Sequence, residues 1–355
     1  MNEIQGSTSQ NIIVGGTCNK ICTSTNSNSI IVGGSNNLAN NGSISIGHST
    51  IVGGTLNTAT GGYSFIGAGT NNCTTSPARY SAIVAGGNNK ISSCYSFIGG
   101  GCENTTLGNW GVIGGGYLNN ICSGEILGTI GGGRLNVVGG DYGTVAGGYC
   151  NRALDNCSFI GGGCCNEASC TNTTIAGGSD NIAGGTYSTI GGGYGNVSCG
   201  AYSFLGGGDG NDTSGTKSFI GGGSFNQATQ NFTTVGGGLV NRVSAKYGSI
   251  LGGRCNYVTA QSGSILGGYR NCVNHADSHI IGSQINSTTT CTTFVNNLYV
   301  TGSTSTNSLL TLARLETTPG VEVLQTGSIF HSGSDGAGCL YFSPNGSTIC
   351  KISFA

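Results

Sequence analysis

The sequence predicts an all-β protein, a parallel β-solenoid (β-roll) of about 18 coils of 15 residues. Three observations predict it. A glycine-rich unit recurs at a regular interval through most of the chain, and glycine supplies 70 of the 355 residues. Each unit carries an aliphatic residue at the same place. The unit is too short for the helix of a βα repeat, so each repeat is expected to form one coil that pairs with the next.

The repeating unit reads Ser-Phe-Ile-Gly-Gly-Gly-x-x-Asn, as in residues 158–166 and 218–226. Its asparagine marks 18 units, from Asn19 to Asn286. From Asn136 onward every step is 15 residues, and the longer early steps carry their extra residues after the asparagine, in a loop. At about 4.8 Å per coil, the stack is expected to form a rod of roughly 80 Å.

Each coil is expected to hold two short strands. The first ends in the glycines and carries the aliphatic residue six places before the asparagine, as at Ile160 and Ile175. The second follows the asparagine and carries a small or β-branched residue two places after it, as at Ala153 and Val243. These two positions are expected to fill the interior, and the glycines between the strands suit a tight bend.

The asparagine column is predicted to form a structural ladder at a corner of the coil. A side-chain amide repeated on every coil can hydrogen-bond to its neighbour or to turn backbone, and asparagine tolerates left-handed backbone angles. The ladder is expected to include Asn136, Asn151, Asn166, Asn181, Asn196, Asn211, Asn226, Asn241, Asn256 and Asn271.

On the outward face of the first strand, a large side chain at one position is accompanied by a small side chain two residues away. A phenylalanine seven places before the asparagine is always followed, two residues later, by glycine, whereas Leu251 and Leu266 follow Ser249 and Ser264. Matched volumes indicate close packing, so this face is predicted to be the subunit interface of a homotrimer. The alternative is an exposed phenylalanine that lies over its own glycine. The expected interface residues are Phe65, Phe97, Phe159, Phe204, Phe219, Leu251 and Leu266.

A longer pattern, Ser-x-Ile-Gly-Gly-Gly-x-x-Asn-x-Ala-x-Gly-x-Tyr-Ser, is clear at residues 188–203. It resembles the head repeats of YadA-type trimeric bacterial adhesins, and even more the glycine-rich repeats of bacteriophage and other viral tail fibres. The resemblance covers residues 11–286. It implies a trimeric, left-handed β-roll with two strands per coil. The 15-residue coils differ from the 14-residue coils of the adhesins.

The chain is expected to have three parts: an N-terminal tail (1–10), the β-roll shaft (11–286) and a β-rich C-terminal cap or tip (287–355). The last part reads as a hairpin, with strands at 340–342 and 348–354 around a turn at Pro344, Asn345 and Gly346. A cap would cover the open strand edges of the last coil. A receptor-binding tip is the functional reading, with Phe330, His331, Tyr341 and Phe342 as its candidate residues.

The balance of charged residues and the search for catalytic and metal-binding motifs narrow the classes of function that we expect. The 12 basic residues against 13 acidic ones predict no nucleic-acid partner, and no apolar run predicts insertion into a membrane. No catalytic motif, cofactor motif or metal-ligand spacing is found, so no enzyme activity, cofactor or metal is predicted. His275 and His279 flank one coil boundary and are read as a polar corner. A polysaccharide-cleaving tailspike, which would need paired carboxylates in a groove, is a minor alternative.

The 17 cysteines are expected to be free thiols that fill gaps in the interior, because the start of the chain does not read as a secretion signal. Two pairs are candidate disulfides. Cys150 and Cys165 occupy one column on adjacent coils, and Cys339 and Cys350 belong to the two strands of the terminal hairpin.

The function predicted from these features is a rigid, homotrimeric viral fibre, similar to a phage tail fibre, that displays a tip for host attachment. Its expected partners are two identical chains, other virion or tail proteins, and a receptor or glycan on the host surface. It would be made in the host cytoplasm and become extracellular on the virion. A cellular surface adhesin or an extracellular filament subunit of the same fold is the alternative.

Overall fold

The computed structural model describes residues 1–6, 10–23, 28–40 and 48–296, together with four short strands between 314 and 351. The chain divides into two units, Met1–Asn296 and Asn297–Ala355. The described residues form strands, turns and bends but no helix. They therefore include no apolar helix long enough to cross a bilayer.

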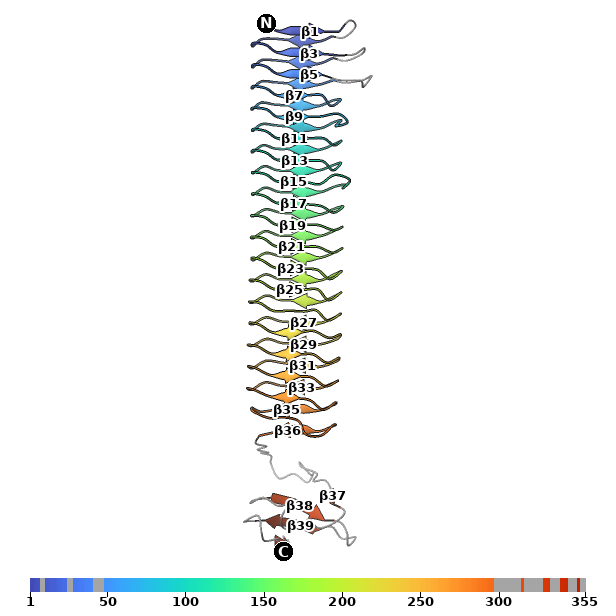
Figure 1. Cartoon of the computed structure of the whole chain (residues 1–355), viewed down its shortest axis with the longest axis vertical. Coiled ribbons are helices and arrows are strands. Elements are labelled where there is room, and N and C mark those ends of the chain that lie inside the picture. The colour runs from blue at the N-terminus through green and yellow to red at the C-terminus, as the bar shows by residue number, and fades with distance from the viewer. Residues whose placement is uncertain are drawn as a thin grey trace, which may run out of the picture. The chain divides into compact units, whose positions relative to one another are not determined.

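The first unit is a stack of coils that adds a strand to each of two parallel sheets at nearly every turn (Figure 1). The strand that follows the asparagine belongs to sheet A. Its strands are β1 (Glu3–Gln5), β3 (Lys20–Cys22), β5 (Leu38–Asn40), β7 (Thr58–Ala59), β9 (Cys73–Thr74), β11 (Lys90–Ile91), β13 (Thr105–Thr106), β15 (Asn120–Ile121), β17 (Val137–Val138), β19 (Arg152–Ala153), β21 (Glu167–Ala168), β23 (Ile182–Ala183), β25 (Val197–Ser198), β28 (Gln227–Ala228), β30 (Arg242–Val243), β32 (Tyr257–Val258) and β34 (Cys272–Val273).

The strand that precedes the glycines belongs to sheet B. Its strands are β2 (Ile12–Ile13), β4 (Ile30–Ile31), β6 (Thr50–Ile51), β8 (Phe65–Ile66), β10 (Ala82–Ile83), β12 (Phe97–Ile98), β14 (Val112–Ile113), β16 (Thr129–Ile130), β18 (Thr144–Val145), β20 (Phe159–Ile160), β22 (Thr174–Ile175), β24 (Thr189–Ile190), β26 (Phe204–Leu205), β27 (Phe219–Ile220), β29 (Thr234–Val235), β31 (Ser249–Ile250), β33 (Ser264–Ile265), β35 (His279–Ile281) and β36 (Thr293–Val295).

Pairing between coils keeps one register from the first coil to Asn271. The register then shifts by one residue: Asn286 pairs with Cys272, and the N–H of Ile285 rather than that of Asn286 donates to Oδ1 of Asn271. Asn286, the last asparagine of the predicted repeat, is therefore exposed and outside the ladder.

Each strand pairs in parallel with the strand of the next coil, and equivalent positions face each other, as Phe204 faces Phe219. In sheet A, isolated bridges through Asp212 join β25 to β28. A third line of bridges runs two residues before the asparagines, from Thr17 to Tyr269. The parallel β-solenoid predicted from the repeat is therefore confirmed.

The solenoid begins earlier and ends later than the repeat indicated. Asn2 acts as a ladder residue, because its Oδ1 accepts a hydrogen bond from the backbone N–H of Asn19 at 3.0 Å. The strand after it, β1, pairs with β3. At the other end β36 pairs with β35. Residues 1–10 are thus not simply a tail, and the stack continues beyond 286 to the end of the first unit.

The interior is filled by four inward positions of each coil. The aliphatic residue of sheet B and the small or β-branched residue of sheet A are buried almost throughout the stack, as are the ladder asparagine and the residue eight places before it. Ile160 and Ala168 are examples, both with no exposed surface. A thin apolar core therefore runs along the stack, bordered by buried polar columns.

Each ladder asparagine satisfies backbone groups on its own coil and on the next. The Nδ2 of Asn166 donates to the carbonyl of Gly162, four residues earlier, at 3.0 Å, and to that of Gly178 on the next coil at 2.9 Å. Its Oδ1 accepts from the backbone N–H of Asn181 at 3.1 Å. The other nine asparagines predicted for the ladder are buried and hydrogen-bond in the same way.

The glycine three places before each ladder asparagine is required by close approach as well as by backbone angle. Gly163 has φ +92°, and a Cβ there would lie 2.0 Å from the carbonyl oxygen of Gly178 and 2.8 Å from Nδ2 of Asn166. Any side chain would push the coils apart and break the asparagine's contact. The residue directly before the asparagine is also left-handed, even when it is leucine, as at Leu135 (φ 58°).

Volumes are matched inside the core. The position eight places before the asparagine is glycine at Gly143, where a Cβ would lie 2.8 Å from Cγ1 of Val138. One coil later it is Ser158, and the corresponding sheet A residue is Ala153. Gly248 repeats the first arrangement, since its Cβ would lie 2.6 Å from Cγ1 of Val243. In these two coils the valine of sheet A is thus accommodated by glycine across the core, whereas Ile91 and Val273 are followed by the buried Ser96 and Ser278.

The second unit contains a small sheet in the order β37 (Arg314–Leu315), β38 (Ser328–Ser332), β39 (Cys339–Ser343) and β40 (Cys350–Lys351). Strands β39 and β40 are antiparallel, as the predicted hairpin requires, and β38 pairs with β39 in the same sense. The register sets Cys350 opposite Phe342, and Cys339 opposite Ser332. Cys339 and Cys350 therefore do not face each other, and the disulfide suggested for them is wrong.

Replacing Asn166 by alanine tests the ladder. The change leaves the N–H of Asn181 and the carbonyl of Gly162 without a partner in a buried place, while the carbonyl of Gly178 keeps the N–H of Cys164 at 2.9 Å. Because each unpaired group costs about 1–3 kcal/mol, we expect the free energy of unfolding in urea to fall by about 2 kcal/mol or more. The control Glu167→Ala removes only a surface ion pair with Arg152 and should cost less than about 1 kcal/mol. Equal losses would contradict the role given to the amide.

Replacing Gly143 by alanine tests the matched volumes. The new methyl group should overpack against Val138 and lower the thermal stability, by about 1–3 kcal/mol. Adding Val138→Ala should restore part of the loss, since the pair then resembles Ala153 and Ser158. If the double variant loses as much stability as the two single variants together, the two sites do not share space, and the interpretation is wrong.

Candidate interaction surfaces

The residues predicted to form a subunit interface lie in one stripe on the outer face of sheet B. In the single chain the five phenylalanines are 38–43% exposed, and Leu251 and Leu266 are 60% and 51% exposed. Phe204 and Phe219 stack, with ring centroids 5.6 Å apart. The structure therefore gathers these side chains on one surface, and their burial between chains stays a prediction.

The size trade along this stripe has an explanation within one chain. A Cβ on Gly67 would lie 2.3 Å from the carbonyl oxygen of Val84 on the next coil and 3.4 Å from Cε1 of Phe65. Gly206 is placed in the same way below Phe204. The ring thus lies over its own glycine, as the alternative interpretation proposed. The glycine makes room for the ring of its own coil, so the matched sizes alone do not require a partner chain.

A second property of the stripe does not follow from the coil. Its two outward positions, seven and five places before each asparagine, hold no Asp, Glu, Lys or Arg in any coil from Asn19 to Asn286. On the outer face of sheet A, by contrast, a single position one place after the asparagine holds Lys20, Lys90, Arg152, Glu167, Asp212 and Arg242. Sheet B therefore presents an uncharged surface along its whole length, here called the uncharged stripe.

A column of aromatic residues occupies the left-handed corner that leads into sheet B. Tyr80 stacks between Tyr63 and Tyr95, with centroid distances of 4.8 and 5.1 Å, and Trp110 continues the stack at 5.4 Å. Sequence reasoning missed this column, although tyrosine recurs six places after the asparagines. Because each ring covers the next, the stack presents mainly ring edges to solvent. Such pairs stabilise by about 0.5–1.5 kcal/mol, so the column acts as a brace between coils.

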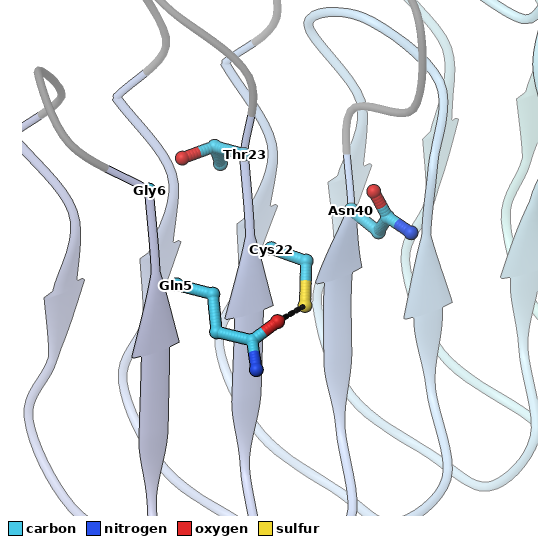
Figure 2. A pocket seen from close by; sticks show the side chains of 5 residues that line it. All are labelled: Gln5, Gly6, Cys22, Thr23 and Asn40. Carbon is cyan, nitrogen blue, oxygen red and sulfur yellow. Dashed lines mark hydrogen bonds between the residues drawn. The ribbon is translucent and has the colours of Figure 1, made fainter.

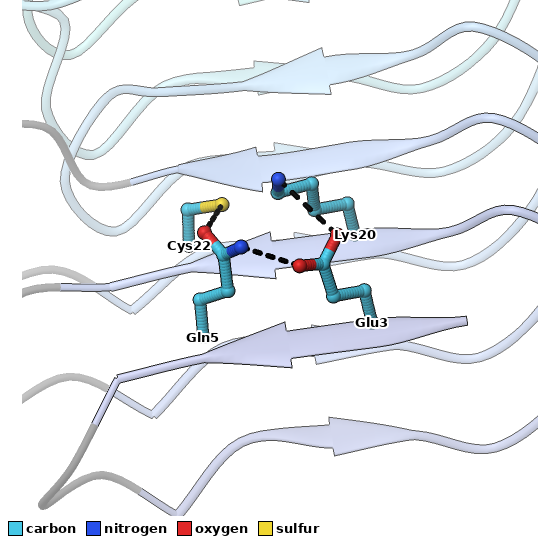
Figure 3. A network of polar contacts seen from close by, with 4 residues as sticks. All are labelled: Glu3, Gln5, Lys20 and Cys22. Atoms are coloured by element: carbon cyan, nitrogen blue, oxygen red, sulfur yellow. Dashed lines mark hydrogen bonds and ion pairs between the residues drawn. The ribbon is translucent and has the colours of Figure 1, made fainter. Parts of the chain in front are cut away.

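The first coils carry a polar network on sheet A, drawn in Figure 3. Nζ of Lys20 lies 3.2 Å from Oε2 of Glu3, and Gln5 donates to the other oxygen of that carboxylate. The hydrogen bond from Lys20 holds the pKa of Glu3 below its usual value and raises the pKa of Lys20. The thiol of Cys22 contacts Oε1 of Gln5 at 3.4 Å. The network ties β1 to β3 on an exposed surface.

A shallow hollow lies beside this network, lined by Gln5, Gly6, Cys22, Thr23 and Asn40 (Figure 2). These residues belong to the ends of β1, β3 and β5 and to the positions that follow them. None of the five side chains is a base that would activate the thiol of Cys22.

The cysteines are not the interior fillers that the sequence suggested. Every cysteine of the first unit is a free thiol and is at least partly exposed. The reason is that none occupies one of the four inward positions of its coil. The predicted pairing of Cys150 with Cys165 is absent, and Sγ of Cys165 instead lies 3.3 Å from Sγ of Cys164. Hydrogen bonding with Cys164, together with burial and the nearby Cys150, raises the pKa of Cys165 to about 12.

Two clusters bear on catalysis and metal binding. Burial, followed by the charge of Asp141, raises the pKa of Glu125. Oδ1 of Asp141 accepts a hydrogen bond from the backbone N–H of Ile126 at 2.8 Å. His279 contacts Oγ of Ser264 at 2.6 Å, and His275 contacts Oδ1 of Asn274 at 2.7 Å. Within the described residues, no group of three ligands suited to a metal ion is found.

The candidate tip residues lie on two adjacent strands of the second unit. Phe330 of β38 faces Tyr341 of β39, His331 faces Leu340, and Phe342 faces Ile329. The backbone thus brings the four residues to neighbouring positions of one sheet. Their role in binding stays a prediction.

Comparison with known proteins adds no relative. No protein-family model matches the chain, and no curated protein matches it.

Proposed function

We propose that the chain forms the shaft of a homotrimeric viral fibre, similar to a phage tail fibre, in which three solenoids pack through their uncharged stripes. The observation that carries the proposal is the absence of charged residues from both outward positions of sheet B, over the length of the stack. Exposed phenylalanine, leucine and valine on this surface match the apolar core of a permanent interface. A left-handed β-roll, implied by the resemblance, is part of the proposal.

The architecture supports a mechanical role. Each coil contacts mainly its neighbours, so the number of coils sets the length and repetition sets the stiffness. The ladder asparagine and the inward aliphatic residue recur in nearly every coil, and the outward phenylalanine recurs in five of them. Three such stacks side by side would resist bending better than one. In this proposal the second unit caps the shaft or carries the residues that attach to a host, and the protein acts by spanning a distance rather than by catalysis.

The oligomeric state tests the packing. By light scattering, the full chain should have three times the 35.3 kDa mass of one chain. The double variant Phe204→Asp and Phe219→Asp should shift the mass toward one chain, because it places buried, unpaired carboxylates in the interface. Phe225→Asp is the matched control, since Phe225 is 56% exposed, lies outside the stripe and has a left-handed backbone that aspartate tolerates. A folded wild-type monomer would contradict the trimer.

The location of the protein tests the viral role separately. An antibody against the chain should label purified virus particles, at an appendage seen by electron microscopy. Labelling of the surface of the producing cells, with none on particles, would instead support the cellular adhesin of the same fold. This outcome would leave the trimer intact and overturn only the viral assignment.

A further inference from the structure

The near-zero net charge conceals two charged regions along the solenoid. Residues 103–212 contain eight acidic and two basic residues. Residues 213–276, which follow directly, contain no acidic residue at all and five basic ones. The five are Lys217, Arg242, Lys246, Arg254 and Arg270, and all are exposed. The shaft thus changes from an acidic to a basic surface within the stack.

Three of these cations lie on consecutive coils: Arg242 in a sheet A strand, and Arg254 and Arg270 in the corner that leads into that sheet. Arg242 in β30 pairs with Tyr257 in β32, and Arg254 bridges to Tyr269 on the next coil. The guanidinium of Arg270 lies 5.0 Å from the ring centroid of Tyr269, and that of Arg254 lies 5.8 Å from it. We call Arg242, Arg254, Arg270 and the two tyrosines, Tyr257 and Tyr269, the arginine patch.

The positive charge of the patch is not compensated. Arg152 and Arg242 occupy the same position of their coils, yet Arg152 has Glu167 on the next coil at 3.2 Å, where Arg242 has Tyr257. The neighbours of Arg254 in its own column are Leu239 and Tyr269. Neither of the two ion pairs found in the described residues involves the patch. Coils are about 4.8 Å apart, so the three charges reinforce one another within a Debye length.

We propose that the arginine patch binds an acidic polysaccharide through the carboxylate or sulfate groups of successive sugar units. A guanidinium donates a planar pair of N–H groups that fits either anion, and the two tyrosines add ring surface and hydroxyl groups between the arginines. The proposal does not depend on the fibre role, because the patch shares no residue with the uncharged stripe and its arginines are exposed in the single chain.

The spacing favours a polysaccharide over a nucleic acid. Measured along the axis, one cation per coil gives a charge every 4.8 Å or so, which suits a polymer with one anion per sugar. A nucleic-acid duplex carries a charge about every 1.7 Å of its axis. The acidic region of a second copy of the chain could also bind the patch, and the measurement of mass described below distinguishes this contact from binding of a polysaccharide.

The test measures binding of the full-length protein to polygalacturonate, which carries one carboxylate per sugar, and to its methyl ester, which carries none. We expect binding to polygalacturonate only, weakening as salt rises from 50 to 200 mM. The variant Arg254→Gln with Arg270→Gln should lose about tenfold or more in affinity and show a shallower salt dependence, since each lost contact reduces the slope by about one. Unchanged affinity in this variant would overturn the proposal.

Arg134→Gln is the matched control. Arg134 occupies the same position of its coil as Arg254 and lies over Tyr117 and Tyr149, at 5.5 and 5.7 Å, but it belongs to the acidic region. We expect its affinity to stay within twofold of the wild type, and all variants to keep the wild-type melting temperature. An equal loss in Arg134→Gln would show non-specific charge attraction and would overturn the proposal.

Two further measurements separate the other occupants. Oligothymidylate should bind more weakly than polygalacturonate at the same salt concentration, and tighter binding would assign the patch to nucleic acid instead. The mass measured by light scattering should be the same for wild type and for Arg254→Gln with Arg270→Gln at low salt. A smaller mass in the variant, with no polygalacturonate binding by the wild type, would assign the patch to contact between copies of the chain.

Discussion

The amide of the ladder asparagine is the interaction on which the rest of the structure depends. A coil of 15 residues has little apolar surface to bury, and its tight corner turns backbone groups inward. The side chain of Asn166 hydrogen-bonds to the carbonyl of Gly162 on its own coil. On the next coil it hydrogen-bonds to the carbonyl of Gly178 and to the N–H of Asn181. The contact is possible only because Gly163 has no Cβ, which would otherwise lie 2.0 Å from the neighbouring carbonyl oxygen. Asparagine and glycine are therefore a single device, repeated at each coil.

With the corner fixed in this way, the outward positions are free to vary, and each surface has its own character. The outward positions of sheet B hold no Asp, Glu, Lys or Arg, and the corner that leads into sheet B carries stacked aromatic rings. The strands of sheet A carry charged side chains such as Arg152 and Glu167. Because one register holds from the first coil to Asn271, a residue on one coil meets the residue at the equivalent position of the next coil. Tyr80 meets Tyr95, Arg152 meets Glu167 and Arg242 meets Tyr257, so that one-dimensional patterns in the sequence become continuous stripes.

The period, the two strands per coil, the inward isoleucines and the buried asparagines were predictable from the sequence, because each follows from a residue type that recurs at one place. The first coil was missed, since Asn2 lacks the glycine-rich strand that precedes the other asparagines. The cysteines were misplaced because composition suggested filling, whereas their positions in the coil point outward. The pairing of Gly143 with Val138 depends on distances across the core that no periodicity reveals. The arginine patch was hidden by the near-zero net charge, since Arg254 and Arg270 come together only when consecutive coils are aligned.

The central claim is that the coils stack in parallel along one axis under the control of the asparagine ladder. X-ray diffraction from oriented, dried fibres of the protein tests it most directly, because the inter-strand spacing must then lie along the long axis of the particle. The account predicts a strong axial reflection at about 4.8 Å. A reflection at this spacing only perpendicular to the axis, or none at all, would contradict it.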